Sequence, residues 1–196
     1  TYSEVAATLI GNLKSTAIFP YRAMRANSLS ADYVNIAITS FATDLNVGSL
    51  RIRCSEPPLM SSFDVSGVSL LSSSEGSSVA LTEAVNVTSE NVTHIVLYFS
   101  ETDFNNVKLA EATGHLDSMV VSAGSVADKS GNAFPGNNEL NLIREINSTA
   151  DTTPPLLLDA VLNIIDGKIE LTFDEVVEDS KLRPDYFAVV SDLNGD

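Results

Sequence analysis

Acidic side chains gather near the end of the sequence in a pattern that suits a hard cation. One lies in a Thr-Pro-Pro segment and four follow an alternating apolar stretch: Asp151, Asp174, Glu175, Glu178 and Asp179. Calcium takes about six to eight oxygen ligands, and carboxylates are its usual protein donors. We therefore interpret these five residues as candidate ligands of a structural calcium ion, the single cofactor that the sequence suggests. The run lacks the DxDxDG signature of a calcium loop, so a solvated acidic surface is the alternative interpretation.

Three Asn-X-Thr sequons provide candidate modification sites. Their asparagines are Asn86, Asn91 and Asn147. Such sites accept N-linked glycans in proteins that follow a eukaryotic secretory route. Asn86 lies in a stretch that we interpret as turn-like, which predicts that it is the best acceptor. Asn91 lies at a strand entry, and Asn147 lies just before the Thr-Pro-Pro segment.

Residues suited to catalysis are sparse. His94 and His115 are the two histidines, and neither has the Ser-His-Asp spacing of a nucleophilic triad. The sequence has no zinc-ligand cluster and no glycine-rich phosphate loop. His94 is expected on the face opposite Ile95 and Leu97, exposed to solvent. Cys54 is the single cysteine, expected to be a small buried apolar side chain. These patterns predict a non-catalytic protein.

The acidic candidates flank a strand pattern that occurs twice. In the second occurrence a turn at Asp166-Gly167 leads into alternation, with Ile169, Leu171 and Phe173 on one face. The same design stands 119 positions earlier, where Gly48, Leu50, Ile52, Cys54 and Glu56 match Gly167, Ile169, Leu171, Phe173 and Glu175. The register holds without a gap to Ser72 and Ser191. The chain therefore contains an internal repeat with a period of about 119 residues.

The rest of the chain reads as short strands separated by turns. Strands are predicted near 33–42, 49–55, 66–72, 77–82, 92–99, 116–122 and 138–147, with one helical crossover over 102–112 capped by Thr102. This pattern is typical of an all-β protein, and we predict antiparallel immunoglobulin-like (Ig-like) β-sandwich repeats. Residues 1–32 would end one repeat, 33–150 would form a complete repeat, and 151–196 would begin the next.

Composition limits the partners. The chain has 196 residues, of which 44% are hydrophobic, and a formal net charge of −15. That charge argues against binding to nucleic acid and to anionic membrane surfaces. No apolar run reaches the roughly 20 residues of a membrane-spanning helix. The buried tryptophan and cysteine pair of antibody domains are both missing, which disfavours an antibody-type domain.

Several stretches together resemble a known class of repeat. They are DTTPP, DGKIELTFDE, DYFAVVS, ETDFNNVKLAE and VADKSGNAF. The chain resembles bacterial-type Ig-like repeats, which occur in tandem arrays in large surface, adhesin and filament proteins. The first copy departs from the second, with Pro57-Pro58 where the second has Val176-Val177, and its linker lacks the Pro-Pro pair.

The resemblance implies an extracellular or cell-surface structural module, part of a filament, flagellar hair or adhesin stalk. Its partners would be adjacent repeats of the same polypeptide and neighbouring copies in a filament. The alternatives are a ligand- or glycan-binding adhesion module and an accessory domain of a secreted enzyme. A binding module would be expected to expose aromatic side chains in its loops. We also expect the two end segments to be completed by further chain or by neighbouring molecules.

Overall fold

The computed structural model of the chain describes residues 30–74 and 76–188. The chain divides between Asp32 and Tyr33 into two units. Since the described part of the first unit is residues 30–32, the fold presented here is that of the second. The predicted end of a preceding repeat falls almost wholly on residues 1–29, outside the described residues.

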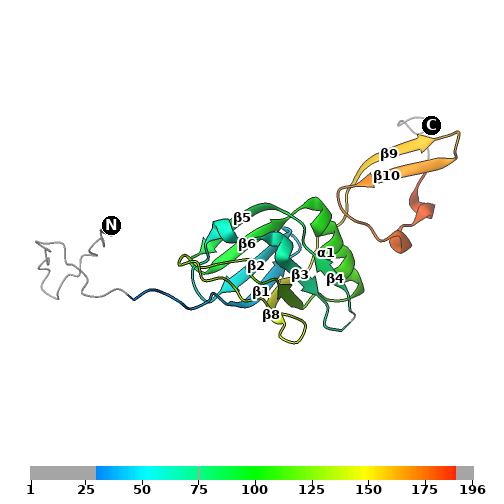
Figure 1. Cartoon of the computed structure of the whole chain (residues 1–196). Helices are drawn as coiled ribbons and strands as arrows, with labels where there is room; N and C mark the ends of the chain where they lie inside the picture. The colour runs from blue at the N-terminus through cyan, green and yellow to red at the C-terminus, as the bar shows by residue number, and fades with distance from the viewer. Residues whose placement is uncertain (1–29, 75, 189–196) are drawn as a thin grey trace, which may run out of the picture. The chain divides into compact units, whose positions relative to one another are not determined.

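The described residues of the second unit form one large sheet and a hairpin that is not hydrogen-bonded to it (Figure 1). The large sheet is built from β1 (Ile38–Asp44), β2 (Ser49–Cys54), β3 (Val68–Leu71), β4 (Ser78–Ala80), β5 (Ala84–Asn91), β6 (His94–Phe99), β7 (Ser118–Val121) and β8 (Ile143–Thr149). The hairpin is built from β9 (Leu157–Asn163) and β10 (Lys168–Phe173). Most of the described chain is thus strand and loop, as the sequence predicts for an all-β protein.

The large sheet is mixed, which corrects the expectation of a purely antiparallel one. Its strand order is β4-β3-β7-β8-β1-β2-β6-β5. Strand β8 pairs antiparallel with β7 through Ile143 and Arg144, and then parallel with β1 from Glu145 to Thr149. The sequence could not show this pairing, because alternation reveals which face of a strand is buried but not which strand lies beside it. The two four-stranded halves therefore meet through one strand.

Buried apolar residues of the described chain form one core cluster, to which both halves of the large sheet contribute. On β2 the side chains of Leu50, Ile52 and Cys54 are buried, whereas Arg51 and Arg53 are exposed, which confirms the register predicted from their alternation. The other half of the sheet contributes alternate residues of β3 and β7 to the same cluster. Burial raises the pKa of the Cys54 thiol to about 11, so this cysteine is an apolar filler with little thiolate character.

The predicted helical crossover is present as α1 (Glu101–Thr113), and it packs against β4 and β6 (Figure 1). Its N-cap is Ser100 rather than the predicted Thr102: the Ser100 hydroxyl accepts a hydrogen bond of 3.1 Å from the Asp103 backbone N–H. Asp103 is itself buried and accepts hydrogen bonds from the backbone N–H groups of Thr82 and Glu83. These contacts fix the start of α1 against the loop that follows β4.

Strand β5 was not predicted. Its sequence, AVNVTSEN, shows little alternation, and its side chains are mostly exposed because β5 is the edge strand beyond β6. Asn86, predicted in a turn, lies within this strand opposite Tyr98. A polar edge strand is stabilised by its backbone hydrogen bonds to the neighbouring strand, so its own residue pattern gives little indication that it is a strand.

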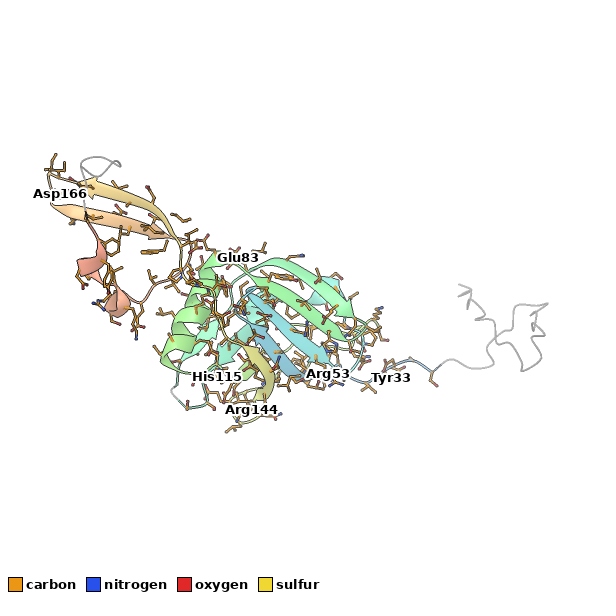
Figure 2. All side chains as sticks on the ribbon, turned by 180° about the vertical axis from the view of Figure 1, so that it is seen from behind. Tyr33, Arg53, Glu83, His115, Arg144 and Asp166 are labelled. Atoms are coloured by element: carbon orange, nitrogen blue, oxygen red, sulfur yellow. The ribbon has the colours of Figure 1, made fainter. Side chains whose placement is uncertain are left out.

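The hairpin β9–β10 has element bounds that each lie 119 positions after those of β1–β2. Two short 3-10 turns follow at the same offset, with Asp179–Lys181 matching Met60–Ser62 and Pro184–Tyr186 matching Val65–Gly67. The turn glycines have nearly equal dihedral angles, with φ of 65° at Gly48 and 62° at Gly167. Figure 2 labels Asp166 in the second of these turns. Within the described part of the chain, no helix is long and apolar enough to cross a membrane.

Candidate functional site

The five predicted calcium ligands do not converge on one point. Among the described residues, no three of them bring oxygens within 4.8 Å of one another. The Asp174 carboxylate accepts a hydrogen bond of 2.7 Å from the Leu156 backbone N–H, which fixes the entry to β9. Glu178 and Asp179 lie at the start of the 3-10 turn after β10, where Glu178 accepts a hydrogen bond from the Ser180 hydroxyl. Their binding of calcium stays a prediction.

Two of the five do meet, and a lysine ammonium lies between them. Lys108 Nζ is 2.7 Å from Asp151 Oδ2 and also donates to Glu175 Oε2. The exposed fractions of the three side chains are 11% for Lys108, 22% for Asp151 and 13% for Glu175. We call these three residues the junction cluster. It joins α1, the segment after β8 and the segment after β10.

Aromatic side chains position the lysine. The ammonium of Lys108 lies 4.4 Å from the centroid of the Phe104 ring, one helical turn earlier on α1. That ring is stacked on Phe99, with centroids 6.1 Å apart and planes 11° from parallel. A cation over an aromatic face is attracted by the ring quadrupole. Because Phe99 ends β6 inside the core, the lysine stem is fixed to the large sheet.

The acidic side of the cluster is held by local hydrogen bonds. Asp151 Oδ1 accepts a hydrogen bond of 3.0 Å from the Thr153 backbone N–H. The next residue, Thr152, donates from its backbone N–H and its hydroxyl to Asn46 Oδ1, each at 3.0 Å. The segment after β8 is therefore attached both to the turn between β1 and β2 and to α1.

The cluster is an ion pair network. Burial alone would lower the pKa of the Lys108 ammonium, but its hydrogen bonds to Asp151 and Glu175 outweigh burial and raise that pKa. Burial likewise favours the neutral Asp151 carboxyl, but the hydrogen bonds from Lys108 and Thr153 outweigh it and lower the pKa. The opposite charges thus attach the three segments of the junction cluster to one another electrostatically.

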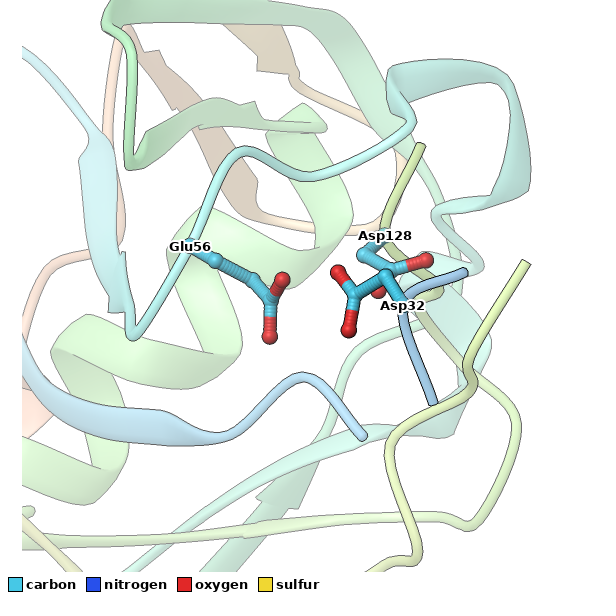
Figure 3. A group of neighbouring side chains, drawn as sticks. All are labelled: Asp32, Glu56 and Asp128. Carbon is cyan, nitrogen blue, oxygen red and sulfur yellow. The ribbon is translucent and has the colours of Figure 1, made fainter. Parts of the chain in front are cut away.

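A second pair of carboxylates belongs to the loops after β2 and β7. Figure 3 shows the side chains of Glu56 and Asp128, of which one oxygen each lies within 4.8 Å of the other. The Asp128 carboxylate accepts hydrogen bonds from the Ser130 backbone N–H at 2.7 Å and from the Asn132 backbone N–H at 2.8 Å. These hydrogen bonds stabilise the tight turn that contains Gly131, so the Asp128 carboxylate has a structural role in its own loop.

The three sequon asparagines are all exposed. Asn86 lies on β5 and Asn147 on β8, and both point to the outer, polar face of the sheet, opposite Tyr98 and Ala42 respectively. Asn91 ends β5, where its Oδ1 accepts a hydrogen bond of 3.0 Å from the Thr93 backbone N–H. Their use as glycosylation sites stays a prediction.

The two histidines occupy different environments. His94 is half-buried rather than exposed, and its Nδ1 lies 2.6 Å from Asn91 Oδ1. His115, labelled in Figure 2, follows α1. It lies between two carboxylates, with Nδ1 3.1 Å from Glu111 Oε2 and Nε2 3.0 Å from Glu145 Oε2. The hydrogen bond to Glu111 and the nearby acidic charges raise the pKa of His115, although burial opposes them. The sequence predicted neither the contacts of His115 with Glu111 and Glu145 nor the role of Lys108.

One signal for the junction cluster was present in the sequence. Asp151 and Glu175 have acidic counterparts 119 positions earlier, at Asp32 and Glu56, so the acidic pair belongs to the repeated pattern. The lysine had no such signal, because its partners lie 43 and 67 positions away and nothing in the sequence links α1 to them.

The chain shows little similarity to known proteins. No protein-family model matches the chain, and no curated protein matches it. Among solved structures, the chain is similar to the crystal structure of the S-layer protein rSbsC(31-844), with 12% identity over 70% of this chain and a TM-score of 0.38. The chain spans 19% of the length of that protein.

Proposed function

We propose that this chain is a non-catalytic structural module of a long extracellular repeat protein, which builds a cell-surface filament, flagellar hair or adhesin stalk. The observation that carries the proposal is the duplicated hairpin. A protein that works through one site needs its scaffold once, whereas an array is made by repeating one structural unit along the chain.

The duplication extends to irregular details of the backbone. Hairpin β1–β2 pairs Asp44 with Ser49 through to Ile38 with Cys54, and β9–β10 pairs the residues 119 positions later in the same register. Each hairpin has a bulge at the same place, where Thr39 and Leu158 are the extra residues. A bulge is a local feature of one strand pair, so its recurrence supports two copies of one unit.

The strand order supports an Ig-like sandwich for the complete copy, residues 33–150. Strands β1-β2-β6-β5 form one half and β4-β3-β7-β8 the other. With the strands lettered in chain order, β1 as A and β8 as G, these halves read A-B-E-D and C′-C-F-G, which is the arrangement of Ig-like domains. Helix α1 then takes the place of the connection between strands E and F. Residues 151–196 would begin the next copy.

An extracellular location follows from the same proposal. The net charge of −15 favours the solubility of such an array. If the protein follows a eukaryotic secretory route, Asn86 and Asn147 are expected to carry glycans on that face. Intact-mass measurement of native protein tests this point, and an unmodified mass would remove glycosylation from the proposal.

A graft tests the repeat proposal directly. Appending residues 72–150 of this chain after Val190 would give β9–β10 the remainder of a copy at the 119-residue offset. We expect the backbone amides of β10 to become protected from hydrogen exchange and a second cooperative unfolding transition to appear. The control appends the same residues in scrambled order. A parallel graft carries Ala160→Phe and Phe173→Cys, which match the hairpin to the borrowed core. If β10 remains unprotected in both grafts, the repeat proposal is wrong.

A further inference from the structure

The junction between the complete copy and the next hairpin brings two carboxylates together, and these require a cation between them. Asp151 after β8 and Glu175 after β10 are 24 positions apart in sequence and direct their carboxylates at one point. Two carboxylates this close repel each other unless a cation lies between them. The structure places the Lys108 ammonium there, from α1 of the preceding copy.

We propose that Lys108 is a built-in cation that recognises the next repeat and sets the geometry of the junction. This inference rests on the proposed function, because it takes β9–β10 as the start of a second copy. The lysine is the contribution of one copy, and the acidic pair is the contribution of the segment that follows. The kind of partner that this surface fits is thus a repeat with an aspartate in its linker and a glutamate after its second strand.

The position of Lys108 suits this task better than a surface ion pair would. Its side chain is 11% exposed, and its ammonium is held over Phe104, so one end of the contact is preorganised. Exposed ion pairs contribute about 0–1 kcal/mol because both partners must be immobilised and both are screened by salt. In the junction cluster the stacked Phe99 and Phe104 rings and the Asp151–Thr153 hydrogen bond already restrict both partners.

The chemistry also distinguishes this junction from a metal-linked one. Calcium requires about six to eight oxygens, whereas the cluster directs two carboxylates at a nitrogen that donates to both. The carboxylates of Asp174 and Glu178 accept hydrogen bonds within the second copy. The charge that a metal ion would provide comes from the chain itself, so the junction geometry is expected to be independent of calcium.

Distance measurement between spin labels tests the proposal on the whole 196-residue chain. Labels on Val85→Cys in β5 and Ile165→Cys in the β9–β10 turn report the junction, since these side chains are 76% and 96% exposed. Cys54 is buried and its thiol has a raised pKa, so it remains unlabelled at neutral pH. We expect one narrow distance distribution in the unsubstituted background, unchanged by EDTA or by millimolar calcium.

Lys108→Met keeps the aliphatic stem and removes the charge, and we expect it to abolish the narrow peak. The matched control is Lys129→Met, which makes the same change at an exposed lysine. Lys108→Glu combined with Glu175→Lys places the cation on the other copy and is expected to restore the narrow peak. A narrow peak that survives Lys108→Met, or one that EDTA broadens in the unsubstituted background, would overturn the proposal. Either outcome leaves the graft result, and with it the repeat proposal, unaffected.

Discussion

The two hairpins of this chain have the same backbone and opposite surroundings. In β1–β2, Leu50 is fully buried and Leu45 is 5% exposed, whereas the equivalent Ile169 and Ile164 are 48% and 82% exposed. The register, the bulge and the turn are nevertheless shared. Local sequence is therefore sufficient to specify the hairpin, and the burial of its apolar face depends on neighbours such as β6, β8 and α1.

The hairpins also differ in which strand carries a phenylalanine. The first hairpin has Phe41 on β1 and Cys54 on β2, whereas the second hairpin has Ala160 on β9 and Phe173 on β10 at the equivalent positions. The large aromatic side chain is thus on the first strand in one hairpin and on the second strand in the other. Cores are packed at crystal-like density, so each hairpin fits a different set of covering side chains. We therefore do not expect either hairpin to fit the core of the other without further substitutions.

Truncation of equivalent apolar residues gives the largest contrast between the two hairpins. Leu50→Ala removes buried atoms and leaves a cavity, so we expect a loss of about 3 kcal/mol in the free energy of unfolding. Ile169→Ala, at a half-exposed position, is expected to cost less than about 1 kcal/mol. Denaturant unfolding followed by circular dichroism measures both. Equal losses would show that β9–β10 is covered in solution as β1–β2 is.

The turn glycines give a smaller contrast. Both have positive φ, where an alanine costs about 1–2 kcal/mol. At Gly48 the added Cβ would also lie 3.4 Å from the Phe104 ring, whereas at Gly167 it would meet open space. We expect Gly48→Ala to lower the midpoint of the main unfolding transition and Gly167→Ala to leave it unchanged. A shift of that midpoint by Gly167→Ala would mean that both hairpins unfold as one cooperative unit.

Near neutral pH, the pH dependence of stability is expected to come from His115 and to be the weakest effect. His115 has a raised pKa in the folded state, so its contribution is complete below its unfolded pKa of about 6.5 and is lost as pH rises through the folded value. Stability should therefore decline as the pH rises from about 6.5 through the folded-state pKa of His115. His115→Gln is expected to flatten this decline. Thermal unfolding across that range measures it, and His94→Gln is the control.

Sequence reasoning worked best where a pattern belongs to one strand. The alternation of Leu50, Ile52 and Cys54 predicted their burial, and the offset to Ile169 predicted a second hairpin of the same design. Each of these inferences uses residues that are neighbours along the chain. Strand β5 was not predicted, because an exposed edge strand needs no apolar face and its sequence therefore shows no alternation of apolar and polar residues.

The candidate site was harder to predict than the fold. Asp151 and Glu175 were singled out as acidic ligands, but the cation that they meet is a lysine on a helix 43 residues before Asp151. A lysine between two apolar residues of a helix, as in Val107-Lys108-Leu109, has the pattern of an ordinary solvated side chain. Charge partners that are distant in sequence become visible only when the packing of α1 is known.

The parallel pairing of β1 with β8 has a mechanical consequence. Because the strands run in the same direction, the start of β1 and the end of β8 lie at opposite ends of their shared ladder. Tension applied through the two ends of residues 33–150 would pull the strands past each other lengthwise. Their hydrogen bonds would then be loaded together in shear instead of opening one after another, as they would in a peeled hairpin. Single-molecule pulling should accordingly find that residues 33–150 rupture in one high-force event, while β9–β10 extends at low force.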